Sequence, residues 1–214
     1  MMGIINKIEA LPRMKRRLAI FVEEERWGVV DARIARENAL EVGKELTRER
    51  WLAILEQEKS PALDGALYYL GLKARTRHEL EQYFTRRQYA QPVIVSVMEK
   101  LENYGFVDDE ALSKRAVESL SRQKMGRGAI ERKLRLRGVD KETAREALQE
   151  YDPEDESESA REMAVSLWEK YRRDEPQKRR QKTSAALARR GFSWDSIHDA
   201  MRGLDAEEDL WETD

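Results

Sequence analysis

The sequence predicts a mainly α-helical protein in which three tandem three-helix repeats form an elongated, curved array behind a small β-containing N-terminal subdomain. Two observations carry this prediction. A sequence pattern recurs with a period of about 50 residues, which is typical of repeat architectures. Charged residues make up 38% of the 214 residues and aromatic residues only 7%, which favours a thin helical array with much surface for its core.

The repeat is visible in three segments, Phe84–Tyr89, Leu134–Val139 and Leu187–Phe192. Each has an apolar residue, then basic residues, then a turn residue and a second apolar residue. The turn residues Gln88 and Gly138 are 50 positions apart, and the third follows after 53 more. We therefore predict subdomains over residues 1–59, 60–107, 108–151 and 152–204, followed by an acidic tail over 205–214. The acidic stretch Asp152–Glu158 would be the joint before the third repeat.

The first thirty residues predict a β-meander. Its three strands would contain Ile4–Ile8, Leu18–Val22 and Trp27–Val30, because short apolar runs of this kind are typical of strands. Glu23–Arg26 would be the tight connection between the last two strands, although it lacks the glycine or asparagine that such turns prefer.

Helices are predicted for the rest of the chain, mainly from capping residues. Asp31 would cap a short helix that ends near Asn38, and Thr47 a helix that ends near Lys59. Ser60 and Pro61 would then start a new helix, since proline suits the first helical turn. Further predicted helix starts lie at a capping box on Thr76–Glu79, at Pro92, at Asp108–Asp109, after Gly128 and at Lys141.

The composition argues against catalysis and against bound metals or cofactors. The chain has no cysteine and only two histidines, His78 and His198. Asp108–Glu110 is the best carboxylate cluster, but helix capping explains it more simply than a metal does. Gly126-Arg-Gly128 follows no strand and so does not match a nucleotide-binding loop. We expect a soluble, cytoplasmic protein that acts by binding, because no signal peptide and no membrane span is apparent.

Basic segments are the strongest functional signal. Ala111–Glu150 has eleven basic and six acidic residues, and Lys170–Arg190 has nine and two, although the whole chain has a net charge of −2. Many charge runs are only solvated helix faces, but recurrence in the repeats favours a basic face for phosphates or for an acidic protein groove. The candidate contact residues are Lys124, Arg127, Arg132, Lys133, Arg135, Arg137, Lys178, Arg179, Arg180, Lys182, Arg189 and Arg190, with Arg86 and Arg87 as weaker candidates in the first repeat.

Three tryptophans lie in the last third of the chain. Trp168 falls on an apolar stripe and Trp194 follows a capping serine, so both are expected to pack between helices. Trp211 lies in the acidic tail without an obvious core partner. The tail itself is expected to be disordered or to shield the basic face.

Several motifs together resemble the RecX regulatory proteins of bacteria. They are Ala66-Leu-Tyr-Tyr-Leu70, Arg75-Thr-Arg-His-Glu-Leu80, Leu101-Glu-Asn-Tyr-Gly-Phe-Val-Asp-Asp109, Gly128-Ala-Ile130, Leu134-Arg-Leu-Arg-Gly-Val139 and Leu187-Ala-Arg-Arg-Gly-Phe192. The resemblance covers about Leu63 to Leu204. Three features depart from the family pattern: Gln88 stands where glycine is expected, and the acidic stretch and the tail after Leu204 are not part of it.

The resemblance implies a monomeric partner of the RecA–DNA filament that modulates, and usually restrains, recombination and coprotease activity by lying in the filament groove. It also implies direct binding to single- or double-stranded DNA. From the residues alone, two alternatives stay open: a sequence-tolerant DNA-binding helical module, and a helical adaptor for another acidic protein.

Overall fold

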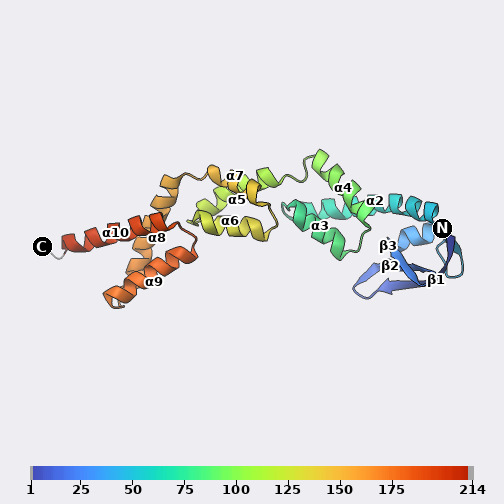
Figure 1. Cartoon of the computed structure of the whole chain (residues 1–214), viewed down its shortest axis with the longest axis horizontal. Helices are drawn as coiled ribbons and strands as arrows, with labels where there is room; N and C mark the ends of the chain where they lie inside the picture. Colours follow the sequence, from blue (N-terminus) through green and yellow to red (C-terminus); the bar gives the residue numbers. More distant parts are fainter. Residues whose placement is uncertain (1, 212–214) are drawn as a thin grey trace. The chain divides into compact units, whose positions relative to one another are not determined.

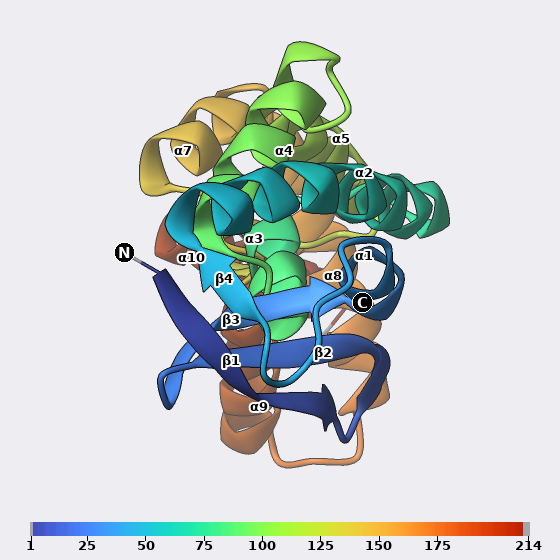
Figure 2. The same cartoon turned by 90° about the vertical axis from the view of Figure 1, so that its right-hand side faces the viewer.

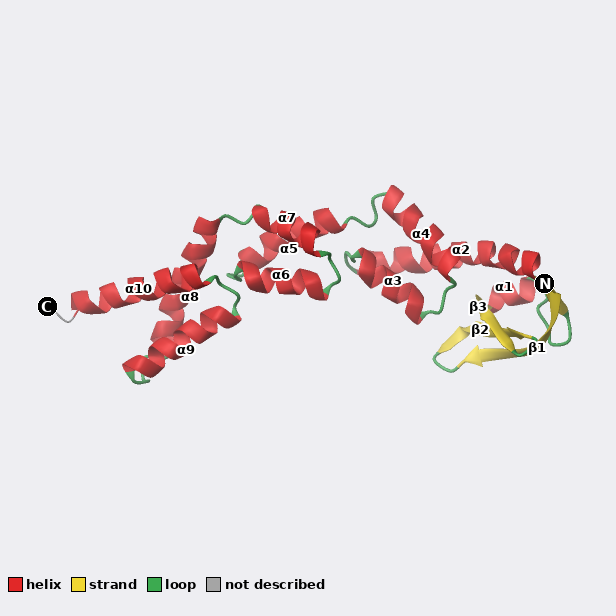
Figure 3. Cartoon of the chain, in the orientation of Figure 1, coloured by secondary structure: helices red, strands yellow, loops and turns green. Residues whose placement is uncertain are grey.

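A computed structural model of the chain describes residues 2–211, including all their side chains except those of Lys15 and residues 205–211. The chain divides into two compact units, one ending at Asp108 and one beginning at Asp109. All described strands belong to the first unit, whereas the second unit is built from helices (Figures 1 and 3). The predicted mainly α-helical class with a small N-terminal sheet is confirmed.

Among the residues that the structure describes, the N-terminal sheet has four antiparallel strands in the order β3-β2-β1-β4. The predicted meander is confirmed as β1 (Met2–Leu11), β2 (Met14–Val22) and β3 (Glu25–Asp31). Glu23 and Glu24 form the turn with φ angles of 49° and 66°, the left-handed values that a two-residue hairpin turn needs. The fourth strand, β4 (Glu45–Thr47), was not predicted, because three residues are too few to show a periodicity.

The two helices after the sheet begin where their caps predict. Asp31 caps α1 (Ala32–Glu37) by accepting a hydrogen bond from the Arg33 backbone N–H, and Thr47 caps α2 (Arg48–Leu72) in the same way. In Figure 2 α2 runs beside the strands, and its residues share one hydrophobic core with them.

The predicted helix break at Ser60–Pro61 is wrong, because α2 continues through Pro61 to Leu72. Proline inside a helix removes one backbone hydrogen bond and crowds the preceding turn. Burial of apolar side chains on both sides of the proline offsets this cost. Trp51 and Ile54 before it and Ala62 and Ala66 after it all pack into one core. The first three-helix repeat therefore shares the helix α2 with residues 48–59 of the predicted N-terminal subdomain, and it shares one core with the sheet.

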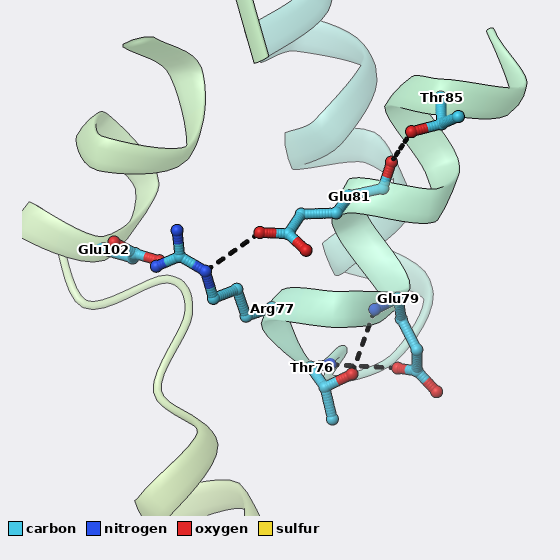
Figure 4. A network of polar contacts seen from close by, with 6 residues as sticks. All are labelled: Thr76, Arg77, Glu79, Glu81, Thr85 and Glu102. Carbon is cyan, nitrogen blue, oxygen red and sulfur yellow. Dashed lines mark hydrogen bonds and ion pairs between the residues drawn. The ribbon is translucent and has the colours of Figure 1, made fainter. Parts of the chain in front are cut away.

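The helices α3 (Arg77–Arg86) and α4 (Gln91–Asn103) complete the first unit. The predicted capping box is present, because Thr76 and Glu79 exchange side-chain-to-backbone hydrogen bonds of 3.0 and 3.1 Å (Figure 4). Arg77 pairs with Glu81 on its own helix and reaches Glu102 on α4. This arginine thereby fixes the start of α3 against the end of α4.

The described part of the second unit, up to Trp211, has six helices. They are α5 (Asp109–Ser121), α6 (Arg127–Leu136), α7 (Lys141–Gln149), α8 (Pro153–Lys170), α9 (Pro176–Arg189) and α10 (Trp194–Trp211). The first three surround one core around Ile130 and Leu134, and the last three surround a second core around Leu187 and Ile197. The acidic tail continues α10 as helical backbone up to Trp211, so the expectation of disorder is wrong over that stretch.

The three aligned turn residues share one backbone conformation. Gln88, Gly138 and Gly191 have φ angles of 58°, 84° and 84°. In each turn the next residue donates its N–H to the carbonyl five positions back, as in Tyr89 to Phe84, which is the pattern of a Schellman motif. Gln88 takes this left-handed conformation without being glycine, at a cost of roughly 1 kcal/mol, and its side-chain oxygen accepts a hydrogen bond from Arg26 of β3.

The acidic stretch is not a linker. Asp152 caps α8 through the Glu154 backbone N–H at 2.8 Å, and Pro153 opens the helix. The remaining acidic residues occupy its first turns, where negative charge interacts favourably with the helix dipole. The expectation of a separate acidic joint is therefore corrected: these residues form the start of the third repeat.

Candidate partner-binding surface

Main-chain contacts join the second and third repeats within the second unit. The N–H of Gly126 donates to the Arg190 carbonyl and that of Gly128 to the Gly191 carbonyl, both at 3.0 Å. This close approach of the two backbones requires glycine at position 126, because a Cβ on Gly126 would overlap the backbone of Gly191 and Phe192. The turn before α6 and the turn after α9 therefore lie directly against each other.

This junction brings together five of the predicted contact residues from the two repeats. Arg190 donates from its guanidinium to the Gln123 carbonyl at 3.0 Å, which places it beside Lys124. The residues grouped here, which we name the junction cluster, are Lys124, Arg127, Arg132, Arg189 and Arg190. They are 57 to 66 positions apart between the two repeats, so only the fold unites them.

Several predicted contact residues have structural partners. Arg127 donates from its guanidinium to the Tyr151 carbonyl at 2.6 Å, and its backbone N–H binds the buried carboxylate of Glu156 at 2.9 Å. The Arg179 guanidinium lies 4.0 Å from the ring centre of Trp168. Lys182 pairs with Asp174 at 2.7 Å. We infer that these three cations stabilise the second unit in addition to any role in binding.

The other predicted residues are more accessible. Arg132, Lys133, Lys178 and Arg189 are exposed, and within the part of the chain that the structure describes none of the four has an ion-pair partner. The remaining candidates differ in their surroundings. Lys124 pairs with Glu162, and Arg135 donates to the Val139 carbonyl. Arg137 is half-buried, whereas Arg180 and Arg86 are exposed. The Arg87 guanidinium lies over the Tyr83 ring.

The basic residues of α9 fall into two groups at opposite ends of the helix. Lys178 and Arg180 lie in its first turns, whereas Arg189 ends it. With a rise of 1.5 Å per residue, the two ends are separated by roughly 15 Å. Arg86 and Arg87 end α3 in the first unit. The structure therefore unites the junction cluster and leaves a continuous basic face over three repeats as a prediction.

Trp194 is more exposed than its sequence context predicts. Its side chain is 74% exposed, so the prediction that it packs between helices is wrong. It continues the stripe of Ile197, Met201 and Leu204 on α10, which are buried, but no element covers its end of the stripe among the described residues. Trp168 is buried as predicted, and the side chain of Trp211 lies outside the described residues.

Two shallow depressions flank Trp194. One, of about 410 Å³, is also lined by Arg127, Arg132, Glu156 and Phe192. The other, of about 310 Å³, is also lined by Arg180, His198, Ile197 and Met201. Cations and an exposed aromatic ring thus occur together beside the junction cluster.

Within the described residues no group of three or more histidine, aspartate or glutamate side chains is placed to hold a metal ion. His78 forms a hydrogen bond with Gln82 at 2.8 Å within α3. None of the described helices is both long enough and apolar enough to span a lipid bilayer.

Comparison with known protein families matches all three predicted repeats. Residues 62–101 match the first three-helix domain of RecX, residues 108–148 the second and residues 154–201 the third. The acidic stretch that departs from the motif pattern thus lies largely inside the third matched domain.

Similar proteins extend the match beyond the repeats. Regulatory protein RecX of Bacillus subtilis is 29% identical over 97% of this chain and 80% of its own length. That of Clostridioides difficile is 27% identical over 95% and 96%, and that of Pelodictyon phaeoclathratiforme is 35% identical over 67% and 88%.

Solved structures agree with this relationship. A crystal structure of regulatory protein RecX has a TM-score of 0.64 and 26% identity, with 92% of this chain and 99% of that chain covered. RecX from Lactobacillus salivarius has a TM-score of 0.65 and 26% identity over 69% of this chain and 97% of its own. With three matched domains and a 35% identical relative covered over most of its length, this chain belongs to the RecX family of regulatory proteins.

Proposed function

We propose that this RecX-family protein binds the RecA–DNA filament, in its groove, and restrains recombinase and coprotease activity without chemistry of its own. The observation that carries the proposal is the junction cluster, in which five cations from two repeats lie on one unit held together by main-chain hydrogen bonds. We further propose that it acts as a monomer in the cytoplasm.

The energetics of such binding are electrostatic. A filament offers DNA phosphates and acidic protein surface, and cations that neutralise phosphates release counterions, so affinity falls as salt rises. This salt-dependent part of the binding free energy would come from the exposed Arg132, Lys133 and Arg189, because they have no competing ion pair among the described residues. Several three-helix domains on one chain also make successive contacts intramolecular, which strengthens weak individual contacts.

The test is the ATPase rate of RecA on single-stranded DNA, titrated with the protein at two salt concentrations. A variant with Arg132→Ala, Lys133→Ala and Arg189→Ala should restrain the ATPase more weakly and with a shallower salt dependence. A matched control removes three exposed bases of α5 and α7, as Arg115→Ala, Lys141→Ala and Arg145→Ala, and should behave as the parent protein.

Three results would argue against this proposal. Equal restraint by the two triple variants would show that the exposed bases Arg132, Lys133 and Arg189 are not the contact. Tight binding of the parent protein to bare DNA, with no effect on RecA, would favour a sequence-tolerant DNA-binding module. Recovery of another acidic protein from nuclease-treated extract, with no effect on RecA, would favour a helical adaptor.

A further inference from the structure

The exposed ring of Trp194 lies at the border of two depressions on the second unit. It is the first residue of α10, and the hydroxyl of Ser193 just before it accepts a hydrogen bond from the Ser196 backbone N–H at 3.1 Å. Because this hydrogen bond and the burial of Phe192 and Ile197 hold the backbone on both sides, the indole is attached to an ordered part of the fold. An exposed tryptophan on a fixed backbone can stack against a flat partner with little loss of conformational entropy.

Cations flank the ring on both sides. The first depression is lined by two positive charges, on Arg127 and Arg132, and one negative charge, on Glu156. The Glu156 carboxylate already accepts a hydrogen bond from the Arg127 backbone N–H. The second is lined by Arg180 and His198, and among the described residues no acidic side chain lines it. The surface therefore has an aromatic ring at its centre, with the exposed Arg132 on one side and Arg180 on the other.

This combination matches unpaired nucleic acid. Proteins bind single strands by stacking bases on aromatic side chains while cations contact the phosphates on either side. Bases in a duplex are already stacked on each other, so they cannot reach an indole without being unstacked. An acidic protein would satisfy the cations but offers no flat ring at each step to cover the indole.

We propose that Trp194 is a base-stacking site for single-stranded DNA, with phosphates on either side bound by Arg132 and Arg180. This deepens the proposed function and rests on it, because it names the part of a DNA filament that the third repeat contacts. It also gives the second unit a preference for unpaired over paired DNA that phosphate contacts alone would not provide.

The experiment uses the full chain and a fluorescein-labelled 20-nucleotide oligo-dT, followed by anisotropy, together with a duplex of the same length. Trp194→Ala should weaken binding to the single strand at least about fivefold, since stacking of one base on an aromatic side chain contributes about 1 kcal/mol or more. Duplex affinity should change by less than about twofold. Trp194→Phe should restore most of the affinity, because a phenyl ring still stacks.

The matched control is Tyr68→Ala, which removes an equally exposed aromatic ring from α2 in the first unit and should leave the single-strand affinity unchanged. Quenching of tryptophan fluorescence by unlabelled oligo-dT should be reduced in Trp194→Phe. Circular dichroism would verify that each variant is folded.

Unchanged single-strand affinity in Trp194→Ala, or an equal loss for single strand and duplex, would overturn the stacking site. So would a variant that binds oligo-dT normally but no longer binds DNA-free RecA, because the depressions would then dock protein. The proposed function is read separately, from the RecA ATPase. Restraint by the parent protein with no contribution of Trp194 to DNA binding would refute the stacking site alone.

Discussion

The backbone N–H of Gly128 donates to the carbonyl oxygen of Gly191 at 3.0 Å, so the main chains of the second and third repeats are in direct contact. A Cβ on Gly191 would overlap the backbone of Ala129, and the φ of Gly191 is 84°. Two independent reasons therefore require glycine at this position.

Replacing Gly191 with alanine should destabilise the protein by about 2 kcal/mol or more, from backbone strain and overpacking together. Gly105→Ala is the matched control. Gly105 also has a positive φ, of 69°, but no atom lies within 4 Å of its hypothetical Cβ, so strain of about 1 kcal/mol should be its whole effect. Urea unfolding measures both, and equal effects would contradict the close approach of the two turns.

The acidic stretch at the start of α8 provides a second test. Glu156 is 3% exposed and accepts the Arg127 backbone N–H at 2.9 Å, whereas Glu158 on the same helix is exposed. Glu156→Ala should destabilise the protein by about 1–3 kcal/mol, because the part-buried N–H of Arg127 loses its partner. Glu158→Ala should stay within about 0.5 kcal/mol. Thermal melts that shift equally would disprove this linking role of Glu156.

A buried ion pair joins the sheet to α2. The Arg17 guanidinium binds the Glu58 carboxylate and the Val29 carbonyl, and the two side chains are 6% and 0% exposed. Arg17→Met should destabilise the protein by about 3 kcal/mol or more, because Glu58 would be left buried without its partner. Arg33→Met, which removes an exposed pair with Glu37, should have little effect.

A double variant with Glu58→Met completes a thermodynamic cycle for this ion pair. Removing both charges should be less harmful than the sum of the two single changes, since each single change leaves one buried charge unpaired. Chemical unfolding of the four proteins gives the coupling energy. Strict additivity would show that Arg17 and Glu58 do not interact.

Ionisation of the buried Tyr89 hydroxyl should lower the stability of the protein at alkaline pH. Burial raises the pKa of its hydroxyl to about 12, although the Arg17 guanidinium beside the ring opposes this. In the unfolded chain the pKa is about 10, so the folded state holds the proton more tightly. This contribution to stability is complete below pH 10 and is lost as the pH rises toward 12.

The measurement is the free energy of unfolding between pH 9 and pH 12 for the parent protein and for Tyr89→Phe. The variant should lose less stability over this interval, because it has no hydroxyl to ionise at this position. Burial also raises the pKa values of Tyr83 and Tyr151. The free energy of unfolding should therefore still decline somewhat with pH in both proteins. Identical pH profiles would mean that Tyr89 ionises alike in both states.

Much of the fold could be predicted because its signals are local. The capping box at Thr76, the caps at Asp31 and Thr47 and the left-handed turns at Gly138 and Gly191 each involve residues a few positions apart. Because such hydrogen bonds join residues close together in the chain, the residue types that they require can be recognised in the sequence. The same is true of the repeat period, which located all three family domains.

The candidate site could be predicted only in part. Basic residues on α6 and α9 are evident from composition, but the sequence does not show that Arg127 and Lys182 have partners within the fold. Nor does it show which bases meet, because the junction depends on hydrogen bonds between Gly126 or Gly128 and residues more than 60 positions away.

The sequence by itself determined the helix boundaries that caps and turns define, the three repeats and the family. Tertiary structure alone decided that α2 continues through Pro61, that Glu156 is a buried acceptor and that Trp194 is exposed. In each of these cases the outcome depends on which distant segment lies opposite the residue. A proline is tolerated where burial on both sides opposes a break, and an apolar stripe is covered only as far as a neighbouring element extends.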